Sequence, residues 1–335
     1  MVKVAIAGAG FIGRIHANCY KHISNANVVA VVDSIEGKSK KLAKQFDASF
    51  YSNLNDLLKN EDIDCVDICA PTFLHAGMVK EVANAGKHVF CEKPIALSLE
   101  EADEMIKIVK RNKVKAMVGH VLRFWPEYVK SKELIDSGEL GDPLYAFCER
   151  LAVTPDWHEN KWGLNKKYSG GVSIDLHIHD LDYLIWLFGR PHLIKSQGVY
   201  NPKLGDLVHI ATSIEFKNGK SGLAEGGWGF IGNFPFTMVL RILCEKGVVE
   251  WIFRAGRNVE KRAQKSNLTV YKNDGSIHTL EVDQTDSYLL ECKYFIGCID
   301  NDLPIEKATL EDGRRALELA LAAMKSAKER KVIKL

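Results

Sequence analysis

The sequence lacks several features that mark particular classes of protein. None of its eight cysteines forms a C-x-x-C pair or a paired zinc spacing, no apolar stretch approaches the ~20 residues that span a bilayer, and no run of five or more like charges occurs. Lys and Arg number 45 against 43 Asp and Glu, for a net charge of +2. No strong overall field therefore attracts nucleic acid or an anionic membrane, and we expect neither as a partner.

The composition is that of an ordinary globular protein. Hydrophobic residues make up 46% and charged residues 26% of the 335 residues, which excludes bulk disorder. At ~150 residues per domain, the length predicts about two domains. Most cysteines lie in apolar runs, as Cys65 and Cys69 do, which favours buried, reduced thiols and a cytoplasmic location. The N-terminal run MVKVAIAGAGFIG carries turn glycines and is interpreted as mature structure, not as a signal peptide.

The first part of the chain, residues 1–122, alternates between short apolar runs and amphipathic stretches. The runs are rich in Val and Ile without polar alternation, which is typical of parallel strands buried on both faces; they span 3–7, 28–33, 65–70, 88–91 and 115–119. Helical spacing predicts helices over 74–86 and 98–112, the second opened by a capping box of Ser98 and Glu101. This alternation predicts a doubly wound α/β domain of the Rossmann type.

The second part, residues 123–335, has a different pattern of predicted helices and strands. Helices are predicted over 124–138 and 171–188, and two more over about 284–301 and 309–329. Between 192 and 282 the sequence offers five to seven strands joined by turn signals. This pattern predicts an α+β domain with a mostly antiparallel open sheet, which would bind substrate and form the oligomer interface, and whose last helix could pack back on the first domain. A tight junction near 122 makes the cleft between the halves the expected ligand site.

A glycine-rich motif follows the first predicted strand. In Gly8-Ala9-Gly10-Phe11-Ile12-Gly13, the first glycine turns the chain, the second admits a pyrophosphate and the third allows close packing of helix on strand. Asp33 ends the second strand 20 residues after Gly13, where an acid accepts hydrogen bonds from the adenosine ribose. Its carboxylate would repel a 2′-phosphate, and Ser34 follows it instead of an arginine. The sequence therefore predicts NAD as cofactor, in preference to NADP.

A lysine follows the predicted strand at 88–91, in the segment Cys91-Glu92-Lys93-Pro94. Doubly wound sheets bind ligands at the carboxyl ends of their strands, so Lys93 is expected to reach the ligand site. The sequence around it, taken alone, also fits an ordinary surface lysine.

Polar residues interrupt the apolar helix predicted over 171–188. Asp175 and His179 are four residues apart and would share one helix face, whereas His177 would point ~200° away from Asp175. Alternatively, Asp175 and His179 form a hydrogen-bonded pair in the core that serves the structure alone. A zinc site is disfavoured because the two imidazoles diverge on a helix and no further ligand stands at metal spacing, so no metal is expected.

These segments together resemble the Gfo/Idh/MocA superfamily of sugar and inositol dehydrogenases. The resemblance rests on GAGFIG, CEKP, GHVLRF (119–124), GGVSIDLHIHDLD (170–182) and the C-terminal DSYLLECKYF…EDGRRALELALAAMKSA, and it covers nearly the whole chain. It implies a catalytic trio of Lys93, Asp175 and His179. Many members have glycine where this sequence has His177, a departure that resembles the inositol-dehydrogenase-like branches.

The resemblance also implies binding residues. The family's cofactor turn matches Pro71, Thr72 and His75, and the Glu-Lys-Pro segment adds Glu92 and Lys93 to the cofactor site. A polyol needs hydrogen bonds and flat apolar faces, and the candidates for its binding are Arg123, Trp157, Trp162, Tyr168 and Tyr288.

The chemistry that these groups support is hydride transfer between a secondary alcohol and NAD. Histidine is the natural base, because its ordinary pKa lies near ~6.5; His179 takes that role, Lys93 stabilises the reacting oxygen, and Asp175 orients it. The expected substrate is a sugar, inositol or sugar derivative, and the expected assembly is a homodimer or homotetramer. The alternatives are a non-sugar dehydrogenase of the superfamily, such as a biliverdin reductase or dihydrodiol dehydrogenase, and a non-catalytic, dinucleotide-binding transcriptional regulator.

Overall fold

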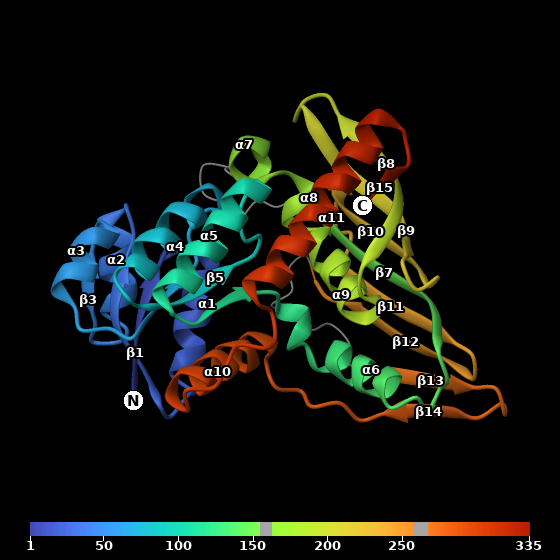
Figure 1. Ribbon diagram of the computed structural model, residues 1–335, viewed down its shortest axis with the longest axis horizontal. Helices are drawn as coiled ribbons and strands as arrows, with labels where there is room; N and C mark the ends of the chain where they lie inside the picture. Colours follow the sequence, from blue (N-terminus) through green and yellow to red (C-terminus); the bar gives the residue numbers. More distant parts are fainter. Residues whose placement is uncertain (155–162, 257–266) are drawn as a thin grey trace. The chain divides into compact units, whose positions relative to one another are not determined.

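The computed structural model describes residues 1–154, 163–256 and 267–335, which divide into two units (Figure 1). The first unit contains Met1–Phe124 and Thr285–Leu317, and the second contains Trp125–Gln284 and Glu318–Leu335. Residues 285–317, which the sequence pattern grouped with the second half, thus pack with the first.

The first unit is built on a six-stranded sheet in the order β3-β2-β1-β4-β5-β6, with every pair parallel. The predicted Rossmann-type sheet is confirmed, and its strands are β1 (Val2–Ala7), β2 (Ala26–Val32), β3 (Ser49–Tyr51), β4 (Cys65–Ile68), β5 (His88–Glu92) and β6 (Ala116–Gly119). Strand β3 was not predicted, because its three residues include no buried one and show no apolar run.

Helices connect and cover these strands. They are α1 (Phe11–Tyr20), α2 (Glu36–Ala43), α3 (Leu54–Asn60), α4 (His75–Asn84), α5 (Leu99–Asn112) and α10 (Ser287–Asp300), with 3-10 turns η1 (Thr72–Leu74) and η2 (Val121–Arg123). The predicted capping box of α5 is present, since Ser98 accepts a hydrogen bond from the backbone N–H of Glu101 at 3.2 Å, and the Glu101 carboxylate accepts one from the N–H of Leu97 at 3.1 Å.

Helix α10 joins the first unit although it is distant in sequence. It packs on α1 and β1, and its buried Cys292, Phe295 and Ile296 enter the core cluster that also contains Phe90 and Met117. The apolar stripe of α10 is therefore covered by the Rossmann sheet and its first helix, which brings α10 residues beside the ends of β4 and β5.

The second unit is built on a nine-stranded sheet in the order β14-β13-β12-β11-β7-β10-β9-β8-β15. Among the strands that the structure describes in this sheet, β7 and β10 alone pair in parallel, which confirms a mostly antiparallel sheet. Its strands are β7 (Pro143–Val153), β8 (Pro191–Asn201), β9 (Asp206–Phe216), β10 (Ser221–Phe230), β11 (Thr237–Cys244), β12 (Gly247–Arg254), β13 (Leu268–Lys272), β14 (Ile277–Leu280) and β15 (Ile333–Lys334). The sequence pattern does not predict β7.

The helices of this unit include α6 (Pro126–Asp136), α7 (Lys166–Ser169), α8 (Val172–Asp175), α9 (Ile178–Phe188) and the end of α11 (Leu310–Glu329). Helices α8 and α9 pack on β7, β9 and β10. Aromatic rings fill the core between helices and sheet: Tyr128 lies edge-on to both Tyr183 and Trp251, with centroid distances of 4.7 and 5.4 Å.

All eight cysteines are unpaired, and seven of them are buried. Among the described residues, no helix combines the length and apolar character that crossing a membrane requires.

Candidate active site

The glycine-rich turn has the geometry that its three glycines require. Gly8 has φ +108°, and a Cβ there would lie 2.6 Å from the carbonyl oxygen of Cys69; a Cβ at Gly13 would lie 1.8 Å from that of Gly8. A Cβ at Gly10 would meet nothing within 4 Å, so this side of the turn is open. Phe11 and Ile12 begin α1, whose N-terminus carries no side-chain cap within the described ranges. Open backbone and uncapped N–H groups fit a pyrophosphate.

Asp33 lies directly after β2, beside this turn. Its Oδ2 accepts a hydrogen bond from the backbone N–H of Ala9, and its Oδ1 accepts one from that of Ile35, both at 2.8 Å. Ser34 beside it is exposed. Each carboxylate oxygen keeps a second lone pair, so Asp33 can accept hydrogen bonds from ribose hydroxyls while it fixes the turn.

The segment after β4 is fixed by a buried histidine. His75 Nδ1 lies 2.8 Å from the carbonyl oxygen of Pro94, and its Nε2 lies 2.8 Å from that of Ala70. Pro71 precedes the η1 turn and Thr72 is buried in it. His75 thus ties the loop after β4 to the loop after β5, which makes it a structural link between two loops of the predicted cofactor site.

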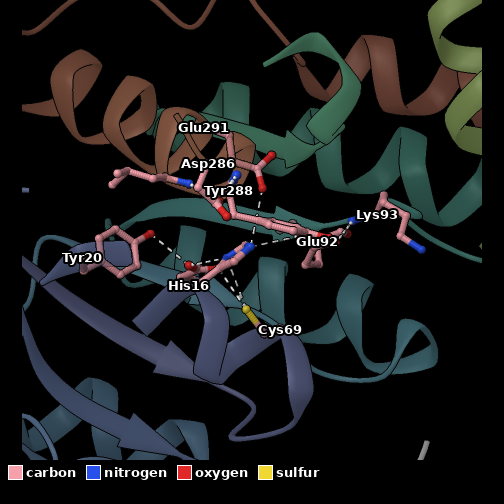
Figure 2. Close-up of polar contacts among 11 residues, drawn as sticks. His16, Tyr20, Cys69, Glu92, Lys93, Asp286, Tyr288 and Glu291 are labelled. Atoms are coloured by element: carbon pink, nitrogen blue, oxygen red, sulfur yellow. Dashed lines mark hydrogen bonds and ion pairs between the residues drawn. The ribbon is translucent and has the colours of Figure 1, made fainter. Parts of the chain in front are cut away.

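The Glu-Lys-Pro segment begins at the carboxyl end of β5. Glu92 is buried, and its Oε2 accepts a hydrogen bond from the backbone N–H of Lys93 at 3.0 Å. Its carboxylate occupies the space that a Cβ at Gly119 would take, 2.6 Å from Glu92 Oε1. The peptide bond before Pro94 is cis. The Lys93 side chain points away from the buried side chain of Glu92 (Figure 2).

The single helix predicted over 171–188 is wrong, because the structure has two helices there. Helix α8 ends at Asp175 and α9 begins at Ile178, and the N–H of His177 bonds to the carbonyl of Val172, five residues back. The regular pattern of α-helical backbone hydrogen bonds, from each N–H to the carbonyl four residues back, is therefore interrupted between Asp175 and His179. Their spacing alone does not place them on one helix face.

The environments of the three polar residues nonetheless differ. His177 is fully buried, its Nε2 lies 2.9 Å from the Thr212 hydroxyl, and burial lowers its pKa to about 3. A Cβ at Gly226 would clash with it at 2.8 Å. Asp175 and His179 are only half-buried. Both belong to the second unit and Lys93 to the first, and their joint action is part of the function proposed below.

The predicted substrate residues fall into three groups. Arg123 is buried and pairs with Asp312 at 3.0 Å, which gives it a structural partner in its own unit. Tyr168 is 43% exposed on α7, and Tyr288 is half-buried on α10. Trp157 and Trp162 lie outside the described residues.

Sequence reasoning missed a buried polar cluster beside Glu92. His16, Asp67 and Glu291 meet there from α1, β4 and α10. Figure 2 shows His16 and Glu291 beside Glu92. A signal for it exists in the sequence, since Asp67 is a charged residue inside the apolar run 65–70 and such residues are rarely buried without partners.

Comparison with known protein families shows which family the chain belongs to. A family described as "Oxidoreductase family, NAD-binding Rossmann fold" matches residues 2–120, and its companion, "Oxidoreductase family, C-terminal alpha/beta domain", matches residues 132–335. The chain belongs to this Gfo/Idh/MocA oxidoreductase family. The resemblance seen in the sequence motifs is thereby confirmed, and the first unit contains an NAD-binding Rossmann fold.

Relatives within the family act on polyols and sugars. The chain is 31% identical to the scyllo-inositol 2-dehydrogenase (NAD(+)) of Bacillus subtilis, over 97% of this chain and 94% of that one. It is 34% identical to a 2,7-anhydro-N-acetylneuraminate hydratase of Mediterraneibacter gnavus, over 74% of this chain and 67% of the relative. Among solved structures, scyllo-inositol dehydrogenase from Lactobacillus casei with NAD(H) and scyllo-inositol has the same fold, with a TM-score of 0.83, 23% identity, and 100% and 99% of the two chains covered.

Proposed function

We propose that this protein is a cytoplasmic, NAD-dependent dehydrogenase that interconverts a secondary alcohol and a ketone of a sugar, inositol or sugar derivative. Residues 1–122 would bind the cofactor, and residues 123–335 would bind the substrate and form the subunit interface. The observation that carries the proposal is that this family member has Lys93 directly after β5 and two half-buried polar residues, Asp175 and His179.

The residues of the first unit fit NAD. The open side of Gly10 and the uncapped N-terminus of α1 suit the pyrophosphate, and Asp33 suits the adenosine ribose. When bound, the nicotinamide ring supplies the hydride acceptor or donor. His179 takes the proton from the reacting hydroxyl, Lys93 donates a hydrogen bond to the same oxygen as negative charge develops on it, and Asp175 orients the hydroxyl.

The proposal is tested by following NADH absorbance with the purified protein and a panel of sugars, inositols and UDP-sugars, with a bile pigment and a dihydrodiol as non-sugar compounds. Reduction of NAD by at least one polyol of the panel is the expected result. Tight NAD binding without turnover of any member, together with capture of a protein partner, would instead support the non-catalytic regulator. Turnover of a bile pigment or dihydrodiol alone would support a non-sugar dehydrogenase.

A second candidate function is hydration of an anhydro sugar. It is favoured by the hydratase of Mediterraneibacter gnavus, which shares 34% identity with this chain. The two functions differ in their products: a dehydrogenase accumulates NADH in step with ketone, whereas a hydratase converts the sugar without net formation of NADH.

Cofactor preference gives one prediction. Because the Asp33 carboxylate repels a 2′-phosphate, we expect the protein to bind NAD more tightly than NADP, and Asp33→Asn to narrow the difference. Asparagine can keep one of the two hydrogen bonds that hold the turn at Ala9 and Ile35, while it removes the charge. Fluorescence titration of both variants with both cofactors measures the four dissociation constants. Tighter binding of NADP by the unchanged protein would contradict the assignment.

Assembly gives another prediction. On the sheet of the second unit, Leu243 and Ile252 are 44% and 41% exposed on two paired strands, next to the ion pair of Arg241 with Glu250. Trp251 points to the opposite, helix-covered face. An open sheet face of this kind needs cover, which a second copy provides by closed symmetry. Light scattering is expected to give a dimer or tetramer, and a mass near 37.5 kDa at micromolar concentration would refute this.

A further inference from the structure

A buried polar cluster lies beside Glu92, the residue before Lys93, in the first unit (Figure 2). His16 comes from α1, Asp67 from β4, Glu92 from β5 and Glu291 from α10, and none of the four is more than 7% exposed. Three carboxyl groups and one imidazole therefore share a site that water barely reaches. Because buried charge is costly, the number of protons on these groups determines the free-energy cost of burying them.

The Asp67 end of the cluster is rich in donors. Asp67 Oδ2 accepts a hydrogen bond from the Tyr20 hydroxyl at 2.9 Å and lies 2.9 Å from His16 Nδ1, and the Cys69 thiol donates to Oδ1 at 3.3 Å. Three donors around one carboxyl group stabilise its ionised form. Asp67 is therefore the anion, and Nδ1 of His16 carries its hydrogen.

The opposite end of the cluster is rich in acceptors. His16 Nε2 lies 3.4 Å from Glu92 Oε1 and 3.5 Å from Glu291 Oε1. Within the described residues, neither oxygen of Glu291 has a hydrogen-bond partner, and neither does Oε1 of Glu92. Even with His16 charged, three ionised carboxylates would leave a net charge of −2 in a buried site, which is costly. One carboxyl group must therefore hold a proton.

Glu291 is the group best placed to hold it. Glu92 already accepts the backbone N–H of Lys93, which favours its ionised form, whereas the donor that Glu291 faces, His16 Nε2 at 3.5 Å, is shared with Glu92. Burial raises the pKa of Glu291 to about 8. Burial lowers the pKa of His16, but Asp67, Cys69 and Cys292 together outweigh it, Asp67 through both its charge and its hydrogen bond, and the pKa of His16 lies well above its ordinary value.

The other titratable groups facing the cluster stay neutral. Burial raises the pKa of the Tyr20 and Tyr288 hydroxyls and of the Cys69 and Cys292 thiols. At neutral pH the cluster therefore contains two anions, Asp67 and Glu92, one imidazolium and one carboxylic acid.

We propose that Glu291 is a positioning residue for Lys93: its protonated carboxyl group leaves Glu92 as the one ionised carboxylate next to Lys93 and so holds the Glu-Lys-Pro segment in place. Oxygen atoms of Glu291 and Glu92 lie within 4.8 Å of each other, so loss of the proton puts two like charges side by side. Glu92 is then displaced, and its hydrogen bond to the N–H of Lys93 weakens. The link from this segment to catalysis rests on the proposed function, but the proton and the hydrogen bond do not.

Infrared difference spectroscopy of the intact protein tests the proton. The unchanged protein is expected to show the carbonyl band of a buried carboxylic acid at neutral pH, lost as the pH rises through about 8. Glu291→Gln should lack this band. Asp300→Asn, which changes an exposed carboxyl group on the same helix, should keep it. A band that persists in Glu291→Gln would overturn the assignment, as would stoichiometric zinc that is present in the purified protein and lost in that variant.

The pH dependence of stability provides a second readout. The pKa of Glu291 is 4.5 in its ordinary state and about 8 in the folded protein, so the folded state binds the proton more tightly. Its stabilising effect is complete below 4.5 and declines as the pH rises toward 8. The free energy of unfolding of Glu291→Gln should therefore fall less over this interval than that of the unchanged protein. Parallel curves would contradict the proton on Glu291.

Hydrogen exchange tests the positioning role without reference to activity. After correction for intrinsic exchange, the Lys93 amide should lose protection above about pH 8 in the unchanged protein but keep it in Glu291→Gln, whose amide mimics the neutral acid. In the enzyme assay, Glu291→Ala should lower kcat. Glu291→Gln should keep most of the kcat of the unchanged protein, and its kcat should not fall as the pH rises above about 8. Equal loss of Lys93 protection in both proteins would overturn the positioning role. Absence of any polyol turnover, with the exchange result as expected, would refute only the proposed function.

Discussion

Lys93→Ala is expected to lower kcat by ~10²–10³, which corresponds to about 2.7–4 kcal/mol of transition-state stabilisation. The ammonium group acts on the reacting oxygen, where negative charge develops as the hydroxyl proton leaves. The rest of the segment is held by other contacts, namely Glu92 on the Lys93 backbone N–H and His75 on the Pro94 carbonyl. Removal of the side chain should therefore leave the backbone in place and NAD binding nearly unchanged.

Steady-state kinetics with the best polyol substrate and fluorescence titration with NAD measure the two effects separately. Lys107→Ala is a suitable control, because Lys107 is an exposed lysine of α5 in the same unit. Loss of NAD affinity comparable to the loss of kcat would show that Lys93 serves mainly the cofactor. Equal kcat values for Lys93→Ala and the unchanged protein would remove Lys93 from the chemistry.

His179→Ala is expected to lower kcat by ~10²–10⁴, the usual contribution of a general base. His177 is the internal control in the same segment. It is buried against the sheet and bonded to Thr212, whereas His179 is half-buried. His177→Ala should therefore destabilise the fold, by ~1–3 kcal/mol for the hydrogen bond that Thr212 loses, and affect kcat little. Kinetics and denaturant unfolding of both variants decide between the two histidines.

The pH dependence of unfolding separates them further. Burial lowers the pKa of His177 to about 3, so it stays neutral in the folded protein, whereas the unfolded chain takes up a proton below 6.5. His177 therefore reduces stability as the pH falls from 6.5 toward 3, and His177→Gln should flatten this decline. If His177→Ala abolished turnover while His179→Ala spared it, both the assignment of the base and the roles carried over from the family would fail.

The double variant Lys93→Ala with His179→Ala is expected to lose less than the product of the two single losses. Groups that act together on one oxygen are not additive, because removal of either already disables the shared step. A loss of kcat in the double variant equal to the product of the two single losses would show that the two residues act in different steps.

The sequence by itself determined the architecture and the phosphate-binding turn. Parallel strands buried on both faces are mostly apolar, so the Val-rich runs of β1 and β2 reveal them directly, although β4 carries the buried Asp67. The glycines of the turn are equally local in their cause, since Gly13 lies too close to the Gly8 carbonyl to carry a Cβ. The cap of α5 at Ser98 is likewise a contact between residues three positions apart.

Only the tertiary structure decided features that depend on distant or subtle contacts. The break between α8 and α9 follows from packing on the sheet, with His177 inserted beside Thr212 and Gly226, and periodicity carries no sign of it. The buried cluster joins His16 and Glu291, which are separated by most of the chain and meet only because α10 packs on α1. Local sequence records which side chains a helix presents, but the partners that set their charge come from elsewhere in the fold.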